Sequence, residues 1–268
     1  MTDDVRNITR RALGRSEARF LTSVGRLPTF SLADGRRVLG KRQGEFVRQF
    51  VDRLEANGWV QRIKPGRFAV IPLSSTTWRA PLHEFLLAME LVQPAAVAYF
   101  SALNHHGFTA QLPRTVFVAT DHRVARPERH ALGITFRLVT LRKARFFGIT
   151  KAWIDERPFM VTDREKTIVD ALDLPRLAGG MGIVSEALRS AWPELDEKRL
   201  RAYAVRIGNS AVAKRLGFLM EVHGVGDAEA LRKAARLAPG YPALDPTLPS
   251  KGTYNRRCGL LVNAKVTV

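Results

Sequence analysis

The order of hydrophobic patterns between residues 31 and 72 constrains the fold more than any other feature of this chain. A short helical pattern that ends near Gly40 is followed by a longer one that ends at Asn57-Gly58. The period then changes from helical to alternating, and Pro65-Gly66 separates two strand-like runs. Two consecutive helices followed by a β-hairpin predict a winged helix-turn-helix, in which the hairpin is the wing.

Local signals set the limits of the expected helices. An earlier helical pattern over residues 16–27 is ended by Pro28. Ser31 is a suitable N-cap for the next helix, in which we expect three residues to face the core: Leu32, Val38 and Leu39. The longer helix carries one apolar stripe, formed by Phe46, Val47, Phe50, Val51 and Leu54. Residues 1–72 are therefore expected to form one domain.

Positive charge is concentrated in this domain. The chain of 268 residues has a formal net charge of +18. Residues 1–80 hold 16 Lys/Arg and 7 Asp/Glu, while residues 81–268 hold 27 and 18, so the same net charge of +9 is spread over more than twice the length. A concentrated cationic surface favours a polyanionic partner such as DNA.

The polar side of the longer helix is where we expect contacts to bases. With the apolar stripe facing the core, the opposite side carries Gln43, Glu45, Arg48, Gln49 and Asp52. The start of the second helix of a helix-turn-helix enters the major groove. We expect Arg48 to bind guanine and Gln43 or Gln49 to bind adenine, each good pair contributing about 1–3 kcal/mol of discrimination.

Cations around that helix are expected to contact phosphate groups. They are Arg36, Arg37, Lys41 and Arg42 ahead of the helix, and Lys64 and Arg67 in the wing. Glu45 and Asp52 would repel phosphate, which limits how deeply this side of the helix can enter a groove. The alternative without DNA is a winged helix that serves as a protein-interaction module.

The rest of the chain mixes helices and strands after a linker over residues 73–81, where small polar residues stand between prolines. The expected fold is α+β: a winged helix-turn-helix over residues 1–72 and a mixed α/β domain over residues 82–268. In the second domain we expect helices over residues 82–92, 95–105, 182–192, 196–207, 209–223 and 227–237, and strands over residues 115–119, 135–141, 146–149 and 158–161. Thr162-Asp163-Arg164-Glu165 is typical of a capping box that opens a further helix. The tail from Pro239 is expected to be extended.

Two segments of the second domain resemble a known family. One runs from Tyr99 to Phe108 and continues over residues 113–118, and the other runs from Val161 to Asp173 and leads to Gly179-Gly180. They follow a winged helix with Gly58-Trp59-Val60 and Pro65-Gly66-Arg67-Phe68 at its junctions. In this order they are similar to the AbiEi-type antitoxins and transcriptional regulators, and the resemblance covers about residues 15–235.

The resemblance implies a protein of two parts that is not an enzyme and needs no cofactor. The winged helix would bind operator DNA and repress a toxin–antitoxin operon. The C-terminal domain would counteract a nucleotidyltransferase-like toxin encoded alongside, by direct contact or by another route. The family has no fixed catalytic residues to carry over.

The residues themselves give little indication of an enzyme. His105 and His106 are adjacent, so on a helix their side chains point about 100° apart and do not chelate one metal ion. We expect them at a helix end, and we expect Asp170 and Asp173 to pair with Arg or Lys. No metal-binding or phosphate-binding motif accompanies them. A nucleic-acid-processing enzyme that uses the winged helix only for targeting remains the alternative.

Two further features bear on location and partners. The single Cys258 excludes an internal disulfide and suits a reducing cytoplasm, and no apolar stretch is long enough to span a membrane. The C-terminal helices carry many cations: Lys198, Arg199, Arg201, Arg206, Lys214, Arg215, Arg232, Lys233 and Arg236. Solvated helix faces, a surface for the DNA backbone and a docking face for an acidic partner all remain open interpretations.

Overall fold

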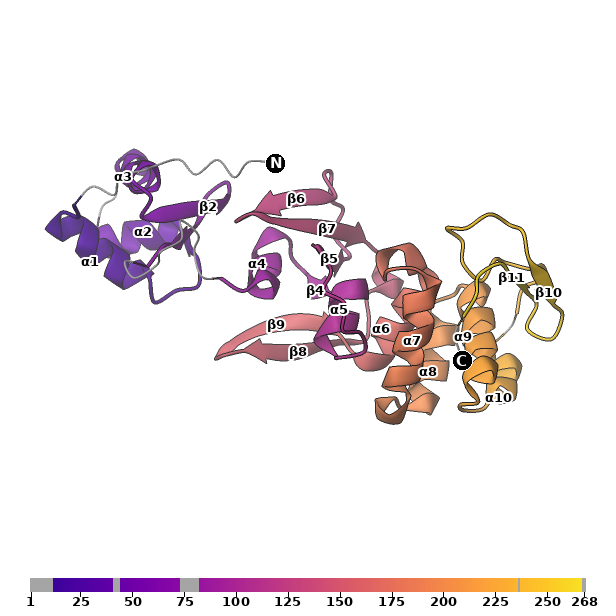
Figure 1. The fold of residues 1–268 in the computed structure, drawn as a ribbon. Helices are drawn as coiled ribbons and strands as arrows, with labels where there is room; N and C mark the ends of the chain where they lie inside the picture. Colours follow the sequence, from indigo (N-terminus) through magenta and orange to yellow (C-terminus); the bar gives the residue numbers. More distant parts are fainter. Residues whose placement is uncertain (1–11, 41–43, 73–81, 236, 267–268) are drawn as a thin grey trace. The chain divides into compact units, whose positions relative to one another are not determined.

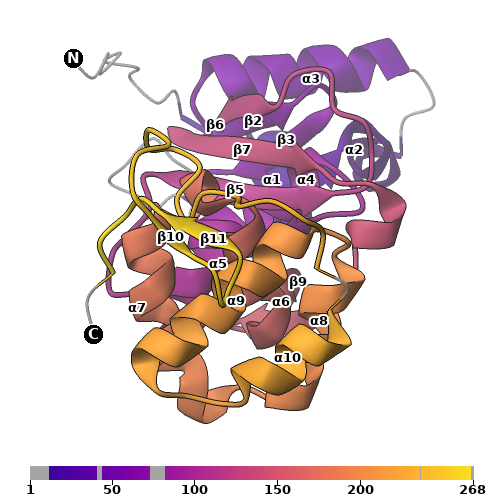
Figure 2. The same ribbon diagram turned by 90° about the vertical axis from the view of Figure 1, so that its right-hand side faces the viewer.

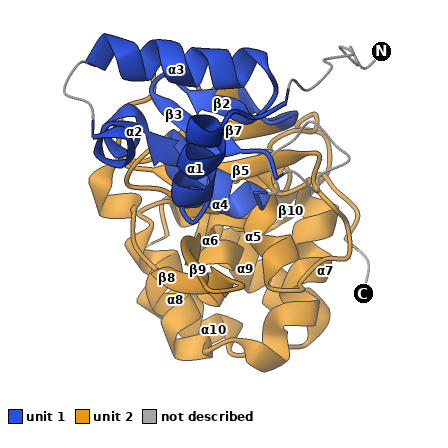
Figure 3. Cartoon of the chain, turned by 90° about the vertical axis from the view of Figure 1, so that its left-hand side faces the viewer, with its two compact units in different colours: residues 1–91, 130–134 blue, residues 92–129, 135–268 orange. Residues whose placement is uncertain are grey.

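The computed structural model describes residues 12–40, 44–72, 82–235 and 237–266, which form a mixed α+β fold (Figure 1). The chain divides into two compact units (Figure 3). Unit 1 comprises Met1–Leu91 with His130–Ile134, and unit 2 comprises Val92–Arg129 with Thr135–Val268. Among the described residues, no helix combines the length and the apolar composition that crossing a membrane requires.

Unit 1 combines helices with a small antiparallel sheet. Its helices are α1 (Arg15–Val24), α2 (Leu32–Leu39), α3 (Gly44–Ala56) and α4 (Glu84–Leu91), and its strands are β1 (Phe30–Ser31), β2 (Val60–Lys64) and β3 (Arg67–Val70). The strand order is β1-β3-β2, with Phe30 opposite Phe68 and Val60 opposite Val70. The short strand β1 was not expected from the sequence, because two residues show no alternation.

Aromatic side chains join these elements in the core of unit 1. The Phe20 ring meets the Phe30 and Phe50 rings edge-on, at centroid distances of 5.7 and 5.2 Å. Phe30 stacks on Phe68 at 5.6 Å. Each such pair contributes about 0.5–1.5 kcal/mol beyond the burial of its area. The core therefore ties α1 and α3 to the sheet.

The predicted limits of α2 are confirmed. The Ser31 hydroxyl accepts a hydrogen bond from the Asp34 amide at 3.1 Å, and the Asp34 carboxylate accepts one from the Ser31 amide at 2.8 Å. The Ser31 hydroxyl also donates to this carboxylate at 2.7 Å, and this bond together with that from the Ser31 amide lowers the pKa of Asp34. Gly40 ends the helix with a φ of 59°, in the left-handed region that suits glycine.

Two residues predicted to face this core are exposed instead. The exposed fractions of Val38 and Phe46 are 40% and 42%. Phe46 lies in the first turn of α3 and stacks on Phe50, one turn further into the core, at 6.3 Å. The apolar stripe of α3 is therefore buried only from Val47 onward.

Helix α4 belongs to unit 1, whereas the sequence-based division grouped residues 82–91 with the C-terminal domain. The Glu90 carboxylate accepts a hydrogen bond from the Thr29 hydroxyl at 2.8 Å and pairs with Arg67 at 3.0 Å. These contacts attach the end of α4 to the residue before β1 and to the first residue of β3. A helical pattern in the sequence does not reveal such a partner.

The second sheet has six strands: β4 (Ala96–Val97), β5 (Thr115–Thr120), β6 (Glu128–Ala131), β7 (Ile134–Thr140), β8 (Ile149–Ile154) and β9 (Arg157–Thr162). Their order is β6-β7-β5-β4-β9-β8. Strands β5 and β7 are parallel, as are β4 and β9, while β4–β5 and β8–β9 are antiparallel. The sheet is therefore mixed.

The helices of unit 2 are α5 (Tyr99–His105), α6 (Arg164–Asp173), α7 (Met181–Ala191), α8 (Glu197–Arg206), α9 (Ser210–His223) and α10 (Ala228–Ala234). Three short 3₁₀ turns are η1 (Lys143–Arg145), η2 (Pro175–Leu177) and η3 (Trp192–Glu194). A terminal hairpin, β10 (Thr253–Asn255) and β11 (Leu260–Val262), packs against α9 (Figure 2). The helices α6 and α9 lie in the interior of this unit, because most residues of each are buried.

Four expectations for unit 2 were wrong in detail. Residues 96–97 form β4 instead of a helix, because they pair with β5 and β9. The strand expected over residues 146–149 begins only at residue 149.

The N-cap of α6 is Asp163, whose carboxylate accepts from the Lys166 amide at 2.8 Å, while Glu165 is fully buried and serves no capping box. The tail contains the β10–β11 hairpin.

Candidate nucleic-acid interface

Helices α2 and α3 approach closely at a glycine. A Cβ added at Gly35 would lie 3.1 Å from Cγ1 of Val47, which is tighter than ordinary contact. Gly35 is the only residue of α2 that is fully buried. This close packing holds the buried side of α3 against α2 and leaves its polar side facing solvent.

The polar side of α3 carries the predicted base-reading residues that the structure describes. Arg48 and Gln49 are exposed, and 65% of the Arg48 side chain is accessible. The Gln49 amide donates a weak hydrogen bond to Glu45 at 3.4 Å, and Arg48 Nε lies 3.8 Å from Asp52. Neither contact is strong enough to hold its side chain away from a ligand.

Arg62, on β2, neutralises two of the acidic residues of α3. Its guanidinium pairs with Asp52 at 2.7 Å and with Glu55 at 2.6 Å, and it lies 4.9 Å from the centre of the Phe68 ring. The hydrogen bonds to Glu55 raise the pKa of Arg62. The phosphate repulsion expected from Asp52 is therefore reduced, while that from Glu45 is not.

Arg62 was not among the predicted site residues. Its two partners lie seven and ten positions away, on a helix that packs beside the strand. Strand alternation shows only that Arg62 and Lys64 share one side of β2. The signal that identifies its role is the position of α3 relative to β2, which only the structure supplies.

The two arginines of α2 lie at the solvent side. Arg37 is 80% exposed and pairs with Asp34 at 3.2 Å. The Arg36 guanidinium lies directly against Gly44, the first residue of α3, where any Cβ would overlap it. A cation beside the first turn of α3 adds to the positive end of the helix dipole. Arg36 therefore places positive charge beside the start of α3, where the acidic Glu45 also lies.

The two cations predicted for the wing, Lys64 on β2 and Arg67 on β3, differ in their surroundings. Lys64 is half-buried at the end of β2, beside the turn in which Gly66 has a φ of 75°. Arg67 is paired with Glu90 at 3.0 Å and lies 3.8 Å from Asp34. Arg67 thus links β3 to α4 and α2. The other predicted residues, Lys41, Arg42 and Gln43, lie outside the described residues.

The histidine pair of unit 2 is arranged as expected for a helix end. His105 is the last residue of α5 and His106 is its C-cap. The Nε2 atom of His106 lies 2.8 Å from the Thr162 carbonyl oxygen, and burial lowers the pKa of this imidazole. Within the described ranges, no group of three or more His, Cys, Asp or Glu side chains is placed to hold a metal ion.

No protein family matches the sequence, and no curated protein is detectably similar to it. The fold does have a counterpart among solved structures. It is similar to the crystal structure of the RV2827C protein from Mycobacterium tuberculosis, with a TM-score of 0.68 and 14% sequence identity. The superposition covers 95% of this chain and 93% of that chain, so the two proteins share one fold over nearly their full lengths.

Proposed function

We propose that this protein binds operator DNA through an N-terminal winged helix-turn-helix and acts as the repressor and antitoxin of a toxin–antitoxin operon. Helices α2 and α3 would be the helix-turn-helix, and β2 and β3 the wing. The order β1-β3-β2 beside three helices is compatible with that fold. The observation that carries the proposal is the exposed side of α3. Arg48 and Gln49 are exposed to solvent there, and Arg62 neutralises the neighbouring Asp52 and Glu55.

In this mechanism, the start of α3 enters the major groove. Arg48 forms two hydrogen bonds with a guanine, and Gln49 or Gln43 pairs with an adenine. Phosphate groups on either side of the groove are bound by Arg36, Arg37, Lys41, Arg42 and Lys64. Arg67 has a structural role in this account, because Glu90 and Asp34 already neutralise it. Bound protein then excludes other proteins from the operator.

The antitoxin role rests on the resemblance of residues 99–118 and 161–180 to the AbiEi-type family. In unit 2, these segments include α5, β5 and α6. They contribute most of their side chains to the interior, so they define the scaffold of the domain. The partner would be a nucleotidyltransferase-like toxin, and unit 2 would act without catalysis or a cofactor.

The DNA-binding part is tested by fluorescence anisotropy with the full chain and two duplexes of equal length. One duplex carries the region upstream of the protein's own gene, and the other carries the same bases in random order. We expect tighter binding to the first. Equal affinity for both duplexes would contradict operator recognition.

The antitoxin part needs a separate measurement. The full chain with Arg48→Ala, which removes the expected base contact, is co-expressed with the product of the neighbouring toxin-like gene. We expect growth to be restored as well as by the unaltered chain, because neutralisation is assigned to unit 2. If neither the unaltered chain nor the Arg48→Ala variant restores growth, the antitoxin role is contradicted. The DNA-binding part of the proposal would not be affected by that result.

A further inference from the structure

A lysine in the middle of α9 is buried without a carboxylate. Lys214 is only 4% exposed, and its ammonium group donates to the carbonyl oxygens of Ala238 at 2.8 Å and Gly240 at 2.6 Å. Burial lowers its pKa, with no ion pair to oppose the shift. An ammonium group has three donors, so two carbonyls leave one N–H free. The charge also lacks a counterion among the described residues.

Lys214 lines an open pocket of about 240 Å³. Gly259, with a φ of 60°, lies close to its ammonium group: a Cβ there would be only 3.3 Å from Nζ of Lys214. Gly240 has a φ of 97°, and a Cβ there would meet no atom within 4 Å. Open space therefore lies at Gly240, whose carbonyl oxygen accepts from the buried cation. Tyr241 lines the same pocket.

Two more cations line this pocket, from the turn between β10 and β11. They are Arg256 and Arg257, both exposed. The described residues that line the pocket include three cations and no carboxylate. Such a set of charges is complementary to an anion with more than one negative charge.

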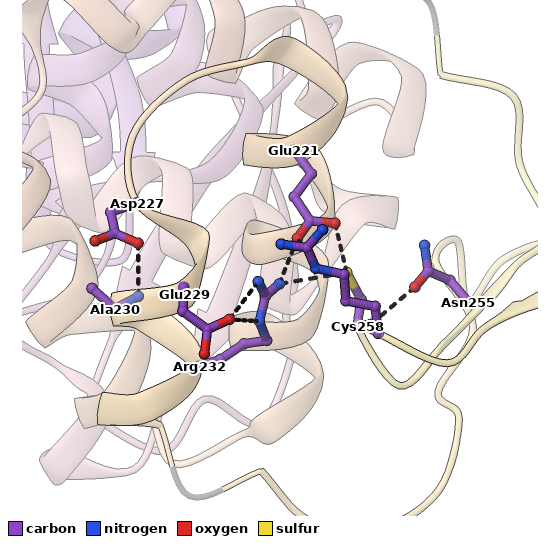
Figure 4. Close-up of polar contacts among 8 residues, drawn as sticks. Glu221, Asp227, Glu229, Ala230, Arg232, Asn255 and Cys258 are labelled. Atoms are coloured by element: carbon purple, nitrogen blue, oxygen red, sulfur yellow. Dashed lines mark hydrogen bonds and ion pairs between the residues drawn. The ribbon is translucent and has the colours of Figure 1, made fainter.

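Side-chain hydrogen bonds hold the turn that carries these arginines. The Asn255 side chain accepts a hydrogen bond from the Cys258 amide at 2.9 Å (Figure 4). The Cys258 thiol donates to Glu221 at 3.4 Å, and Glu221 is also bound by Arg232 at 2.7 Å (Figure 4). Arg257 reaches Glu221 at 3.1 Å, but the side chain remains 71% exposed. A rigid turn reduces the entropy lost when a ligand is bound.

From this geometry we propose that Lys214, Arg256 and Arg257 form a binding site for a phosphate group, either inorganic phosphate or the phosphate of a small monoester. The pocket is below the usual size range of sites for whole drug-sized ligands, which is about 300–1,000 Å³. A phosphate group matches it better, and its oxygens accept hydrogen bonds from Lys214 and both guanidinium groups. The site lies in unit 2 and is independent of the proposed DNA-binding surface.

The test is calorimetric titration of the full chain, without DNA, at constant ionic strength set by chloride. One arm uses inorganic phosphate and the other uses AMP. Arg256→Ala, on an exposed side chain, is expected to weaken phosphate binding roughly tenfold through loss of one charge-assisted hydrogen bond. Lys214→Gln keeps an amide donor for the loop carbonyls and removes the charge, and it is expected to abolish binding. Thermal unfolding shows whether each variant is folded.

The matched control is Lys198→Ala, which removes an exposed cation of α8 and should leave binding unchanged. Tighter binding of AMP than of phosphate, lost in Tyr241→Ala, would identify a nucleotide as the source of the group. Equal affinity for AMP and for inorganic phosphate would show that the site recognises the phosphate group and not the nucleoside. The proposal is overturned if neither compound binds, if Lys198→Ala weakens binding as much as Arg256→Ala, or if the folded Arg256→Ala and Lys214→Gln variants bind like the unaltered chain.

Discussion

Cationic side chains have opposite surroundings in the two units. In unit 1, Arg37 and Arg48 are mostly exposed and make only contacts of 3.2 Å or longer to acidic groups. In unit 2, Lys166, Lys214 and Arg215 are almost fully buried. Lys166 pairs with the buried Asp170 and lies 4.9 Å from the centre of the Phe147 ring. These cations of unit 1 therefore face solvent, while three cations of unit 2 form part of its interior.

Arg215 illustrates the structural use of charge in unit 2. Its guanidinium donates one hydrogen bond to the carbonyl oxygen of Leu172, at 2.8 Å, and two to that of Ala243, at 3.0 and 3.2 Å. Burial lowers the pKa of this group. The three bonds join α9 to the end of α6 and to the terminal segment. The cations counted along the sequence of unit 2 therefore overstate the charge available to a polyanion.

The largest effect is expected from breaking the buried pair in α6. Lys166→Met leaves Asp170 buried without its partner, and we expect a loss of about 3–5 kcal/mol in the free energy of unfolding. Chemical denaturation with a probe in unit 2 measures it. Replacing both residues, as Lys166→Met with Asp170→Leu, should cost less than the single change. A loss below 1 kcal/mol for Lys166→Met would show that the pair is not structural.

Substitution of Arg48, the proposed base-reading residue, is expected to have a smaller effect and to leave stability unchanged. Arg48→Ala should reduce the preference for the upstream duplex over the random one by about 1–3 kcal/mol. Lys64→Ala should weaken binding to both duplexes by similar factors, because a phosphate contact carries no sequence information. An unchanged preference in Arg48→Ala would remove this residue from the proposed groove contact.

The third test concerns Asp52 and Glu55, the acidic residues of α3 that pair with Arg62. Arg62→Gln frees Asp52 and Glu55 on the side of α3, and their negative charge would then face the DNA backbone. We expect affinity for both duplexes to fall roughly tenfold, about 1.4 kcal/mol. The matched control is Arg53→Gln, an exposed arginine of the same helix whose guanidinium lies over the Phe50 ring. Equal losses in the two variants would show that net charge, not neutralisation of these carboxylates, matters.

The smallest effect is expected at the cap of α2. Hydrogen bonds from Ser31 lower the pKa of Asp34 below its ordinary value of 3.8, so the folded state binds the proton less tightly than the unfolded state. The stabilisation is thus present at neutral pH and is lost as the pH falls below about 4. Asp34→Ala should cost about 1 kcal/mol at pH 7 and little at pH 3. The melting temperatures of both proteins at the two pH values measure this difference, and an equal gap at both would contradict it.

Regular patterns in the sequence were sufficient for the periodic elements. The positions of α2, α3, β2 and β3 follow from apolar spacing, the Ser31 cap and the Pro65-Gly66 turn, and these signals are local. The pairing of Asp170 and Asp173 with cations is confirmed, through Lys166 and Arg145. What the sequence did not provide was the identity of a side chain's partner on another element, such as Arg145 of η1 for Asp173 of α6.

The candidate site residues show the same limit, because their contacts to other elements could not be predicted. Arg48 was predictable because helical geometry places it opposite the core, whereas Arg62 depends on the packing of a strand against α3. Arg67 was expected at a phosphate, but its partner Glu90 lies on a helix that the sequence grouped with the other domain. Lys214 was counted among helix cations, although its position in α9 is buried. Burial of a charge depends on its surroundings, and residue type does not report it.

The central claim is that cationic side chains of unit 1 bind the phosphate groups of DNA. The most direct test is the dependence of DNA affinity on salt concentration. We predict that the logarithm of the affinity falls linearly with the logarithm of the salt concentration, and that Lys64→Ala makes this slope shallower by about 0.9. The charge-matched change Lys198→Ala in unit 2 should leave the slope unaltered. A flat salt dependence, or an equal change of slope in both variants, would contradict the claim.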